Sequence, residues 1–438
     1  MRYIADLHIH SRFSRACSPE LTLPNIEKWC RIKGINIIGT GDFTHPQWFK
    51  EMREQLEESE CDGLYRLKPN FQFPISNFQK NAKYQIPNSK TVFFICSTEL
   101  SCIYSRGGRG RRVHHVVLSP SLEVVDKIIK ELEKRGKNLK SDGRPILGID
   151  SEELLKMLLE IDERILLIPA HAWTPWFAIF GSESGFDSIE ECFGKMSKHI
   201  YAIETGLSSD PAMNWRLSAL DKITLISNSD AHSLPNLGRE VNVFETEEKI
   251  SYDWLASVFK NKDQKQFKYT IEFFPEEGKY HFDGHRLCGV RLSPKETKKN
   301  KGLCPVCKKP VTVGAMNRID GLANREEGLM PDRSIPYKSL VPLEKIIAEA
   351  FGVKSSTKGV KAEYEKLTQQ GGSEFGVLLD RSEEELMKMT EPRIVEAISR
   401  VRAGKLLILP GYDGEYGTVK VFTDEEQKRF GKKQSALF

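Results

Sequence analysis

The chain of 438 residues is too long for one small hydrophobic core, so we expect two or more domains. Hydrophobic residues make up 39% and charged residues 29%, as in soluble globular proteins, and no apolar run predicts a membrane span. The net charge of +4 excludes a general polycation, so a nucleic-acid site would need local basic clusters. Without a signal-peptide pattern, we expect a cytoplasmic protein with reduced cysteines.

The first predicted strand ends in the motif Asp6-Leu7-His8-Ile9-His10. Alternate residues of a strand share a face, so His8 and His10 lie together and could bind one metal ion or two neighbouring ions. A His-x-His pair alone is weak evidence, because such pairs are common on exposed strands. Asp6 shares this face, which leaves open a role behind the ligands or in capping a helix.

Other predicted strands, at 35–38, 92–96, 113–118, 164–169 and 224–227, also carry His, Asp or Glu at or near their ends. Such side chains converge at the catalytic rim of an α/β barrel. Each has a structural alternative, and Asp42 could simply cap the next helix. Only one of His114 and His115 can face the interior. The residues concerned are Asp42, His45, Glu99, His114, His171, Asp230 and His232.

This mixture of imidazoles and carboxylates suits Zn, Mn or Fe, with Mg possible, and it is too large for one ion. We therefore expect two or three divalent metals in the barrel. Such ions lower the pKa of bound water and stabilise charge during phosphoryl transfer. The chain has neither a P-loop nor a dinucleotide glycine fingerprint, so phosphoester hydrolysis is the predicted chemistry.

Taken in order, the stretches 6–10, 40–42, 98–99, 114, 171 and 230–232 resemble the motifs of the PHP (polymerase and histidinol phosphatase) superfamily. The resemblance implies an α/β fold, a distorted (β/α)7 barrel with a multinuclear metal centre. In the superfamily's second motif a histidine directly follows the aspartate, whereas Phe43 follows Asp42 here, so Asp42, His45 or both could be ligands. The metal ligands and catalytic residues so implied are His8, His10, Asp42, Glu99, His114, His171, Asp230 and His232.

The stretches 39–46, 203–211, 214–218 and 410–417 resemble the endonuclease Q family, and the likeness covers nearly the whole chain. It implies a DNA repair enzyme that cuts on the 5′ side of uracil, hypoxanthine, xanthine or an abasic site. The damaged nucleotide would be extruded from the duplex, because a base edge cannot be inspected inside the stack. The alternatives are a phosphatase of a small phosphomonoester and a non-catalytic DNA-binding module.

Three segments could contact DNA. The run 106–112 is rich in Arg and Gly, which suits phosphate contact or, alternatively, a solvated hairpin tip. The aromatic loop 173–180 could stack on bases or pack against residues 186–193. The glycine-rich loop 411–417 could reach back to the barrel mouth or form a plain hairpin. The predicted contacts are Arg106, Arg109, Arg111, Arg112, Trp173, Trp176, Tyr412 and Tyr416.

Beyond residue 275 the pairs His285-x-x-Cys288 and Cys304-Pro305-Val306-Cys307 are separated by fifteen residues. This spacing is typical of a structural zinc site. His281 could replace His285 as the fourth ligand, and buried free thiols are the alternative explanation.

We therefore divide the chain into a PHP catalytic barrel (1–275), a zinc-binding module (276–315), a helical DNA-binding region (316–404) and a β-hairpin with a flexible tail (405–438). Residues 46–90 are predicted to be a loop-rich insertion over the barrel mouth. The tail 434–438 resembles the start of a sliding-clamp-binding peptide. No dimer interface is predicted, so we expect a monomer.

Overall fold

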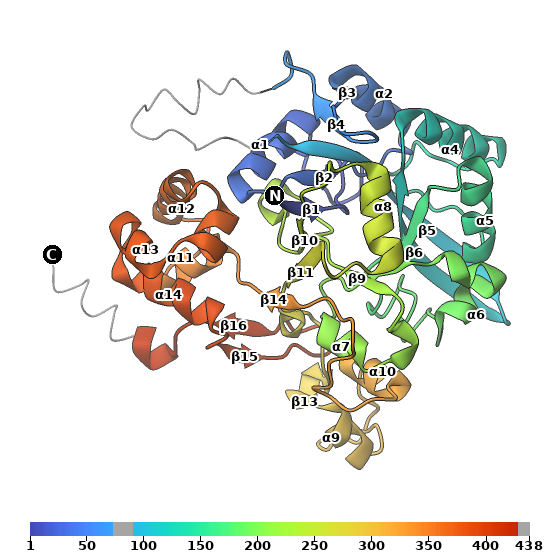
Figure 1. The fold of residues 1–438 in the computed structure, drawn as a ribbon. Coiled ribbons are helices and arrows are strands. Elements are labelled where there is room, and N and C mark those ends of the chain that lie inside the picture. Colours follow the sequence, from blue (N-terminus) through green and yellow to red (C-terminus); the bar gives the residue numbers. More distant parts are fainter. Residues whose placement is uncertain (73–90, 428–438) are drawn as a thin grey trace.

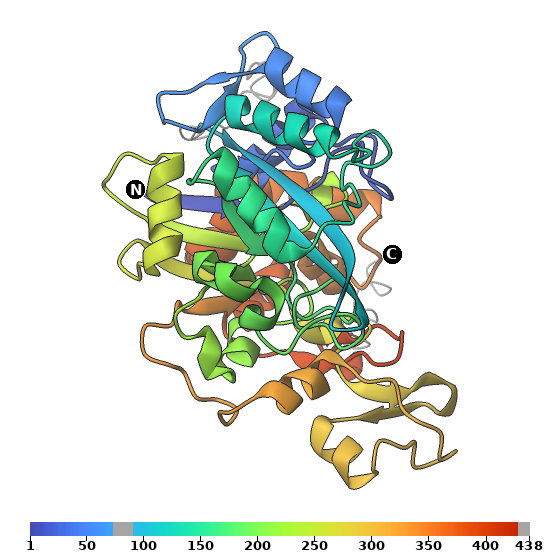
Figure 2. The same ribbon diagram turned by 90° about the vertical axis from the view of Figure 1, so that its right-hand side faces the viewer.

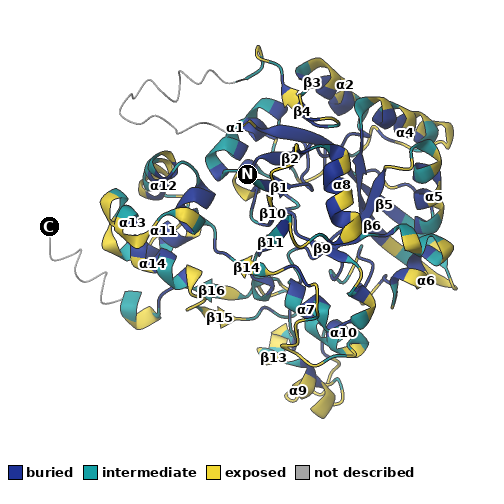
Figure 3. Cartoon of the chain, in the orientation of Figure 1, coloured by how far each residue is buried: buried dark blue, intermediate teal, exposed yellow. Residues whose placement is uncertain are grey.

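The structure is a computed structural model that describes residues 1–72 and 91–427. Figure 1 shows a large α/β part, a small module around β13 and α9, and a helical part beside α1. In the α/β part the central strands are buried, whereas exposed residues are frequent on the outer helices and on the small module (Figure 3).

The α/β part is built on a mixed sheet with the order β14-β11-β10-β1-β2-β5-β4-β3, and β6 and β7 extend it from β5. β1, β2 and β5 run parallel, whereas β1–β10, β5–β6 and β6–β7 are antiparallel pairs. The strands are β1 (Arg2–Asp6), β2 (Ile37–Gly39), β3 (Leu56–Glu58), β4 (Tyr65–Leu67), β5 (Phe93–Arg106), β6 (Arg109–Ser119), β7 (Leu166–Pro169), β10 (Val241–Glu245), β11 (Phe267–Glu272) and β14 (Tyr337–Ser339).

A separate parallel pair is formed by β8 (Ala202–Glu204) and β9 (Thr224–Ile226). Ala172 N–H, just after β7, donates to Glu204 O at 2.9 Å, and His10 N–H, just after β1, donates to Ala231 O at 3.1 Å. These bonds bring the ends of β1, β7, β8 and β9 together. The predicted mixed α/β class is confirmed. The closed barrel stays a prediction, since no strand pairing among the described residues joins β7 to β8.

Helices cover the outside of the sheet, and α4 and α5 lie side by side next to the β5–β6 hairpin (Figures 1 and 2). α4 begins where Ser121 Oγ accepts the N–H of Val124, and its apolar face is buried against the sheet. None of the helices in the described part of the chain is long and apolar enough to cross a membrane. The helices of this part are α1 (Leu23–Lys33), α2 (Pro46–Gln55), α4 (Leu122–Lys134), α5 (Ser151–Ile161), α6 (Ile189–Phe193), α7 (Pro211–Trp215) and α8 (Tyr252–Asn261).

Two local expectations were wrong. The strand predicted at 92–96 does not end before Glu99, because every residue from Cys96 to Arg106 pairs with β6. Glu99 therefore lies inside a long hairpin, whose tip is formed by the Arg/Gly run. The segment 46–72 is not a loop-rich insertion either, since it forms α2 and the strands β3 and β4, which extend the sheet from β5. Residues 73–90 lie outside the described residues.

The remainder of the chain packs against the α/β part at several points. β14 pairs with β11, so the region predicted as helical also supplies a strand. Lys33 Nζ of α1 and Glu374 Oε2 form a buried ion pair at 2.6 Å. The remaining elements are β12 (Asp283–His285), β13 (Val290–Leu292), α9 (Pro294–Lys299), α10 (Ala315–Leu322), α11 (Leu343–Phe351), α12 (Lys358–Gly371), α13 (Glu383–Met389), α14 (Pro392–Arg402), β15 (Leu407–Leu409) and β16 (Thr418–Lys420).

Glu272, the last residue of β11, is a buried carboxyl group behind β8 and β9. Its oxygens accept hydrogen bonds from the hydroxyls of Thr205, Ser227 and Thr270. Burial nevertheless raises its pKa to about 7. The folded state therefore holds this proton more tightly than the unfolded chain, whose Glu pKa is about 4.3. The stabilisation is complete below about pH 4 and is lost as the pH rises to about 7.

Glu272→Gln removes this titration and retains a side chain of the same shape. We expect the Tm of the variant to fall less than that of the parent between pH 5 and pH 8, as measured by calorimetry. Glu245→Gln, which changes an exposed carboxylate on β10, should keep the parental pH dependence. Equal pH dependence in the parent and in Glu272→Gln would contradict the assignment.

Candidate metal centre

The histidines of the opening motif follow β1, and a carboxylate lies against Nδ1 of each ring. His8 Nδ1 is 3.0 Å from Glu204 Oε2, and His10 Nδ1 is 3.0 Å from Asp42 Oδ1. Because a carboxylate engages Nδ1, the opposite nitrogen, Nε2, is directed into the site. The Nε2 atoms of His8 and His10 lie 3.7 and 3.0 Å from Asp230 Oδ1.

Glu99 joins two groups of donor atoms. Its Oε2 lies 3.4 Å from His10 Nε2 and 3.7 Å from His8 Nε2, on the side of Asp230. Its Oε1 lies 2.8 Å from His114 Nδ1 and 3.0 Å from His171 Nε2. One group thus contains His8, His10, Glu99 and Asp230, and the other contains Glu99, His114 and His171. Within each group one atom from every residue lies within 4.8 Å of the others.

Three predicted residues flank these groups. Both oxygens of Asp42 are engaged, because Oδ1 faces His10 and Oδ2 accepts the N–H and O–H of Ser11 at 2.7 Å each. The structure therefore places Asp42 behind His10. The His45 ring stacks on Phe13 with centroids 4.4 Å apart. His232 lies at the open rim, where its ring centroid is 4.6 Å from that of His10.

Neighbouring positive charge holds the carboxylates of Glu99 and Asp230 ionised. Burial alone would raise the pKa of Glu99 and Asp230, because it disfavours the charged form. Imidazoles around both groups, and Arg144 beside Glu99, instead hold these pKa values well below the ordinary range. Burial lowers the pKa of His114 to about 4, whereas the carboxylates around His8, His10 and His171 raise the pKa of those three rings. Metal ions bind ionised carboxylates and neutral imidazoles, so a bound ion would displace the protons that His8, His10 and His171 hold without it.

The donor set fits divalent metal ions. His8 Nε2 is buried and has no hydrogen-bond partner among the described residues. Two donors bound to one ion at about 2.1 Å lie roughly 3 to 3.5 Å apart, which is close to the separations around Glu99 and Asp230. Imidazoles mixed with carboxylates suit Zn, Mn or Fe better than Mg.

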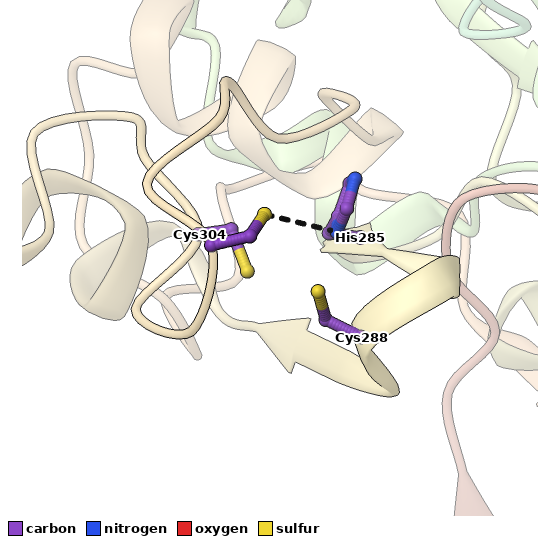
Figure 4. Close-up of side chains that lie close together, drawn as sticks. His285, Cys288 and Cys304 are labelled. Carbon is purple, nitrogen blue, oxygen red and sulfur yellow. Dashed lines mark hydrogen bonds between the residues drawn. The ribbon is translucent and has the colours of Figure 1, made fainter.

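A second group of donors lies in the small module, where His285, Cys288, Cys304 and Cys307 offer atoms within 4.8 Å of one another. The side chains of His285, Cys288 and Cys304 point toward a common centre (Figure 4). His285 Nδ1 lies 3.6 Å from Cys307 Sγ. Of the two histidines considered for the fourth ligand, the structure brings His285 to the cysteines and places His281 in the wall of a separate cavity.

Among the described residues, the buried apolar cluster of this module consists of Leu292, Cys304 and Val311. Such a core is too small to hold a fold by itself, so we expect a metal ion to stabilise the module. His285→Ala should lower the zinc content by one ion per chain and raise amide hydrogen exchange over 283–312. His281→Ala is the matched control and should keep that ion. Retention of the ion by His285→Ala would contradict the assignment.

The predicted aromatic contacts differ in exposure. Trp173 is buried, donates Nε1–H to Asn214 Oδ1 at 2.7 Å and packs on Phe180. It therefore cannot touch DNA without a rearrangement, and the expectation that it does so is corrected. Trp176 and Tyr416 are exposed by 43% and 72%. The loop 411–417 joins the paired strands β15 and β16, and Tyr412 in it pairs with Phe282 through a backbone bridge. Its contact with the barrel mouth stays a prediction.

The arginines of the hairpin tip also differ in exposure and in their contacts within the protein. Arg106 forms an ion pair with Glu152 at 2.6 Å, and Arg111 lies over the Phe186 ring at 4.1 Å. These two side chains support the hairpin. Arg109 and Arg112 are exposed and lie on the surface of the hairpin.

Comparisons with known proteins agree with this architecture. The chain superposes on the crystal structure of the lesion-specific endonuclease PfuEndoQ from Pyrococcus furiosus with a TM-score of 0.81 and 30% identity, over 98% of this chain and 99% of the other. This chain belongs to the endonuclease Q family. A structure of Endonuclease Q with a 27-mer duplex carrying an abasic lesion at the active site matches with a TM-score of 0.80 and 31% identity, over 98% of both chains.

Relatives of this endonuclease Q family member occur among proteins without an assigned activity. YqxK of Bacillus subtilis strain 168 is 28% identical over 95% of this chain and 98% of its own length. MJ0043 of Methanocaldococcus jannaschii is 32% identical over 57% of this chain, which corresponds to 31% of the longer protein. This chain therefore spans about a third of MJ0043. The protein-family model for the MJ0043 C-terminal domain matches residues 342–405 of this chain.

Two residues of the site were not predicted from the sequence. Glu204 ends β8 and accepts hydrogen bonds from His8 Nδ1, from the His171 N–H at 2.8 Å and from Asn228 Nδ2 at 2.9 Å. Its place at a strand end was the available signal. Arg144, in a segment without periodicity, donates Nη1–H to Glu99 Oε2 at 3.0 Å.

Glu204→Gln should weaken metal binding, because it removes the charge that orients His8 and the backbone of His171. Loss of such a supporting group lowers metal affinity about 10- to 100-fold. The measurement is metal content per chain after dialysis against graded chelator. Glu183→Gln, on the exposed part of the 171–187 loop, is the control. An unchanged metal affinity in Glu204→Gln would show that Glu204 only supports the fold.

Proposed function

We propose that this endonuclease Q family member is a metal-dependent DNA endonuclease that cuts duplexes at damaged nucleotides. The observation that carries the proposal is the pair of donor groups joined by Glu99, in a fold that matches endonuclease Q over nearly its full length. The match to a complex with a lesion-bearing duplex supports DNA as the partner.

Residues in direct reach of the centre would hold two or three ions: His8, His10, Glu99, His114, His171 and Asp230. When bound, these ions supply hydroxide near neutral pH and stabilise charge on phosphate oxygens. Asp42 and Glu204 orient the imidazoles, and His232 stands at the rim, where it can bind an ion or the substrate. We propose that the zinc-binding group in the small module is structural, because its four donors leave no open position.

The substrate class proposed is a duplex with uracil, hypoxanthine, xanthine or an abasic site, cut on the 5′ side. A cavity of about 230 Å³ beside the centre supports an extruded nucleotide, and Trp176, Tyr280 and His281 help to line it. Thr174 connects this cavity to the centre, because its Oγ1 lies 3.1 Å from His171 Nδ1. Exposed Arg109, Arg112, Trp176 and Tyr416 are proposed to contact the DNA around the lesion.

The chain is proposed to act as a monomer. Binding to a sliding clamp through residues 434–438 is a further proposal, and this segment lies outside the described residues.

In the deciding experiment, the full-length protein and Mn or Zn are incubated with end-labelled duplexes. The duplexes carry uracil, hypoxanthine, an abasic site or no lesion. We expect a single cut beside each lesion and none in the intact duplex. His8→Ala should lower this rate by at least about 100-fold, since it removes a metal ligand, and should leave the duplex Kd largely unchanged.

His199→Ala, which changes a histidine remote from the centre, is the matched control and should cut at the parental rate. Hydrolysis of p-nitrophenyl phosphate without cutting of any duplex would favour the phosphatase alternative. Binding of lesion duplexes with no cleavage under any metal would favour the non-catalytic alternative. Parental cutting by His8→Ala would contradict the metal centre.

A further inference from the structure

Arg144 is held beside the metal centre by a strap, which we define as residues 142–147. On one side, Ser101 N–H of β5 donates to Pro145 O at 3.1 Å, and Leu147 N–H donates to Ser101 O at 2.9 Å. This pairing fixes the strap two residues away from Glu99 in β5.

The other side of the strap is tied to the loop after β1. Gly143 N–H donates to Phe13 O at 3.0 Å, and Asp142 Oδ1 accepts the N–H of Arg15 at 3.2 Å. A side chain at position 143 would collide with Asp42 Oδ2, so the close approach requires glycine. The strap therefore packs against Asp42 and β5. Arg144 directly follows Gly143, the residue of the strap that lies close to Asp42.

The side chain of Arg144 lies on the open side of the centre. It is 24% exposed, whereas the side chains of Glu99 and His8 are 0% and 1% exposed. Asp230 and His232, with 23% and 31%, are also accessible, so these residues mark the side from which a substrate would approach. Among the described residues the hydrogen bonds of the Arg144 side chain go to Glu99 alone, through Nη1. Most of its five N–H donors are thus available.

A guanidinium at this position cannot serve as a metal ligand, because it has no lone pair to offer. It would also be repelled by divalent cations bound a few ångströms away. Glu99 balances part of that charge, but the same carboxylate is shared by both donor groups. A bound phosphate diester would supply the missing negative charge, and its oxygens match the planar fork of an arginine.

We propose that Arg144 binds the non-bridging oxygens of the scissile phosphate and stabilises the charge that develops on them during cleavage. The inference rests on the proposed endonuclease activity. In the step itself, a hydroxide oxygen forms a bond to phosphorus, the bond from phosphorus to one sugar oxygen breaks, and that oxygen takes up a proton from water. Arg144 keeps its protons throughout and acts through its N–H donors.

Arg144→Ala and Arg144→Lys in the full-length, metal-loaded protein test this role in single-turnover cutting of an abasic duplex. Removal of one such donor group lowers rates about 100- to 1,000-fold, so we expect a loss of that size in Arg144→Ala. Lysine retains the charge without the fork, so Arg144→Lys should recover part of the rate. Metal content per chain should equal that of the parent in both variants. Arg135→Ala, the same change at the remote end of α4, should cut at the parental rate.

A second measurement separates phosphate binding from support of Glu99. A methylphosphonate at the scissile position replaces one charged oxygen by a methyl group, and it should weaken duplex binding more in the parent than in Arg144→Ala. Equal weakening in both proteins would overturn the proposal. So would parental cutting by Arg144→Ala, or a loss of metal that parallels its loss of rate.

Failure of the endonuclease proposal gives a different result. If the parent cuts no lesion duplex, the same variants are compared on bis(p-nitrophenyl) phosphate, a diester without a base. A large loss of hydrolysis in Arg144→Ala would then support the role of Arg144 at a phosphodiester even though the DNA substrate was wrong. Equal hydrolysis by the parent and Arg144→Ala would overturn that role.

Discussion

The shared carboxylate of Glu99 is the interaction on which the rest of the site depends. One oxygen faces His8 and His10, and the other faces His114 and His171. A side chain in this position needs a rigid base. The hairpin supplies it, because Glu99 is the fourth of eleven consecutive residue pairs between β5 and β6. His114 is on the paired strand, so the spacing between Glu99 and His114 is set by the sheet itself.

Several site residues have strained backbone conformations. Asp42, His171 and Asp230 have φ values of 47°, 30° and 46°, a region that non-glycine residues rarely adopt. Each follows a strand, and the turn directs its side chain back toward the centre. Hydrogen bonds hold these turns: Ser11 binds Asp42, Glu204 accepts the N–H of His171, and His8 O accepts the N–H of Asp230. These hydrogen bonds thus offset the backbone strain at the three turns.

The sequence could predict which residues belong to a common metal-binding group, but not which of their atoms lie in contact. The recurring His, Asp and Glu at strand ends, and the spacing of His285, Cys288, Cys304 and Cys307, indicated groups that the structure brings together. Asp42 and Glu204 have the same signal as ligands, yet both lie behind histidines, because side-chain direction depends on turns and on the pairing of β8. Arg144 reaches Glu99 through a strap with no periodic pattern. The buried position of Trp173 depends on Asn214, 41 residues away.

Segments far apart in the chain, 174–176 and 275–281, form most of the wall of the cavity beside the centre. Arg318 of α10 donates to the backbone oxygens of Phe180 and Phe186, so α10 holds the loop that follows His171. The loop 411–417 donates to Glu276 O and Glu277 O through Gly411 and Gly417. A small phosphomonoester would not need a cavity wall assembled from such distant segments. It does provide the extended surface that a duplex requires, so the architecture favours a polymeric diester as substrate.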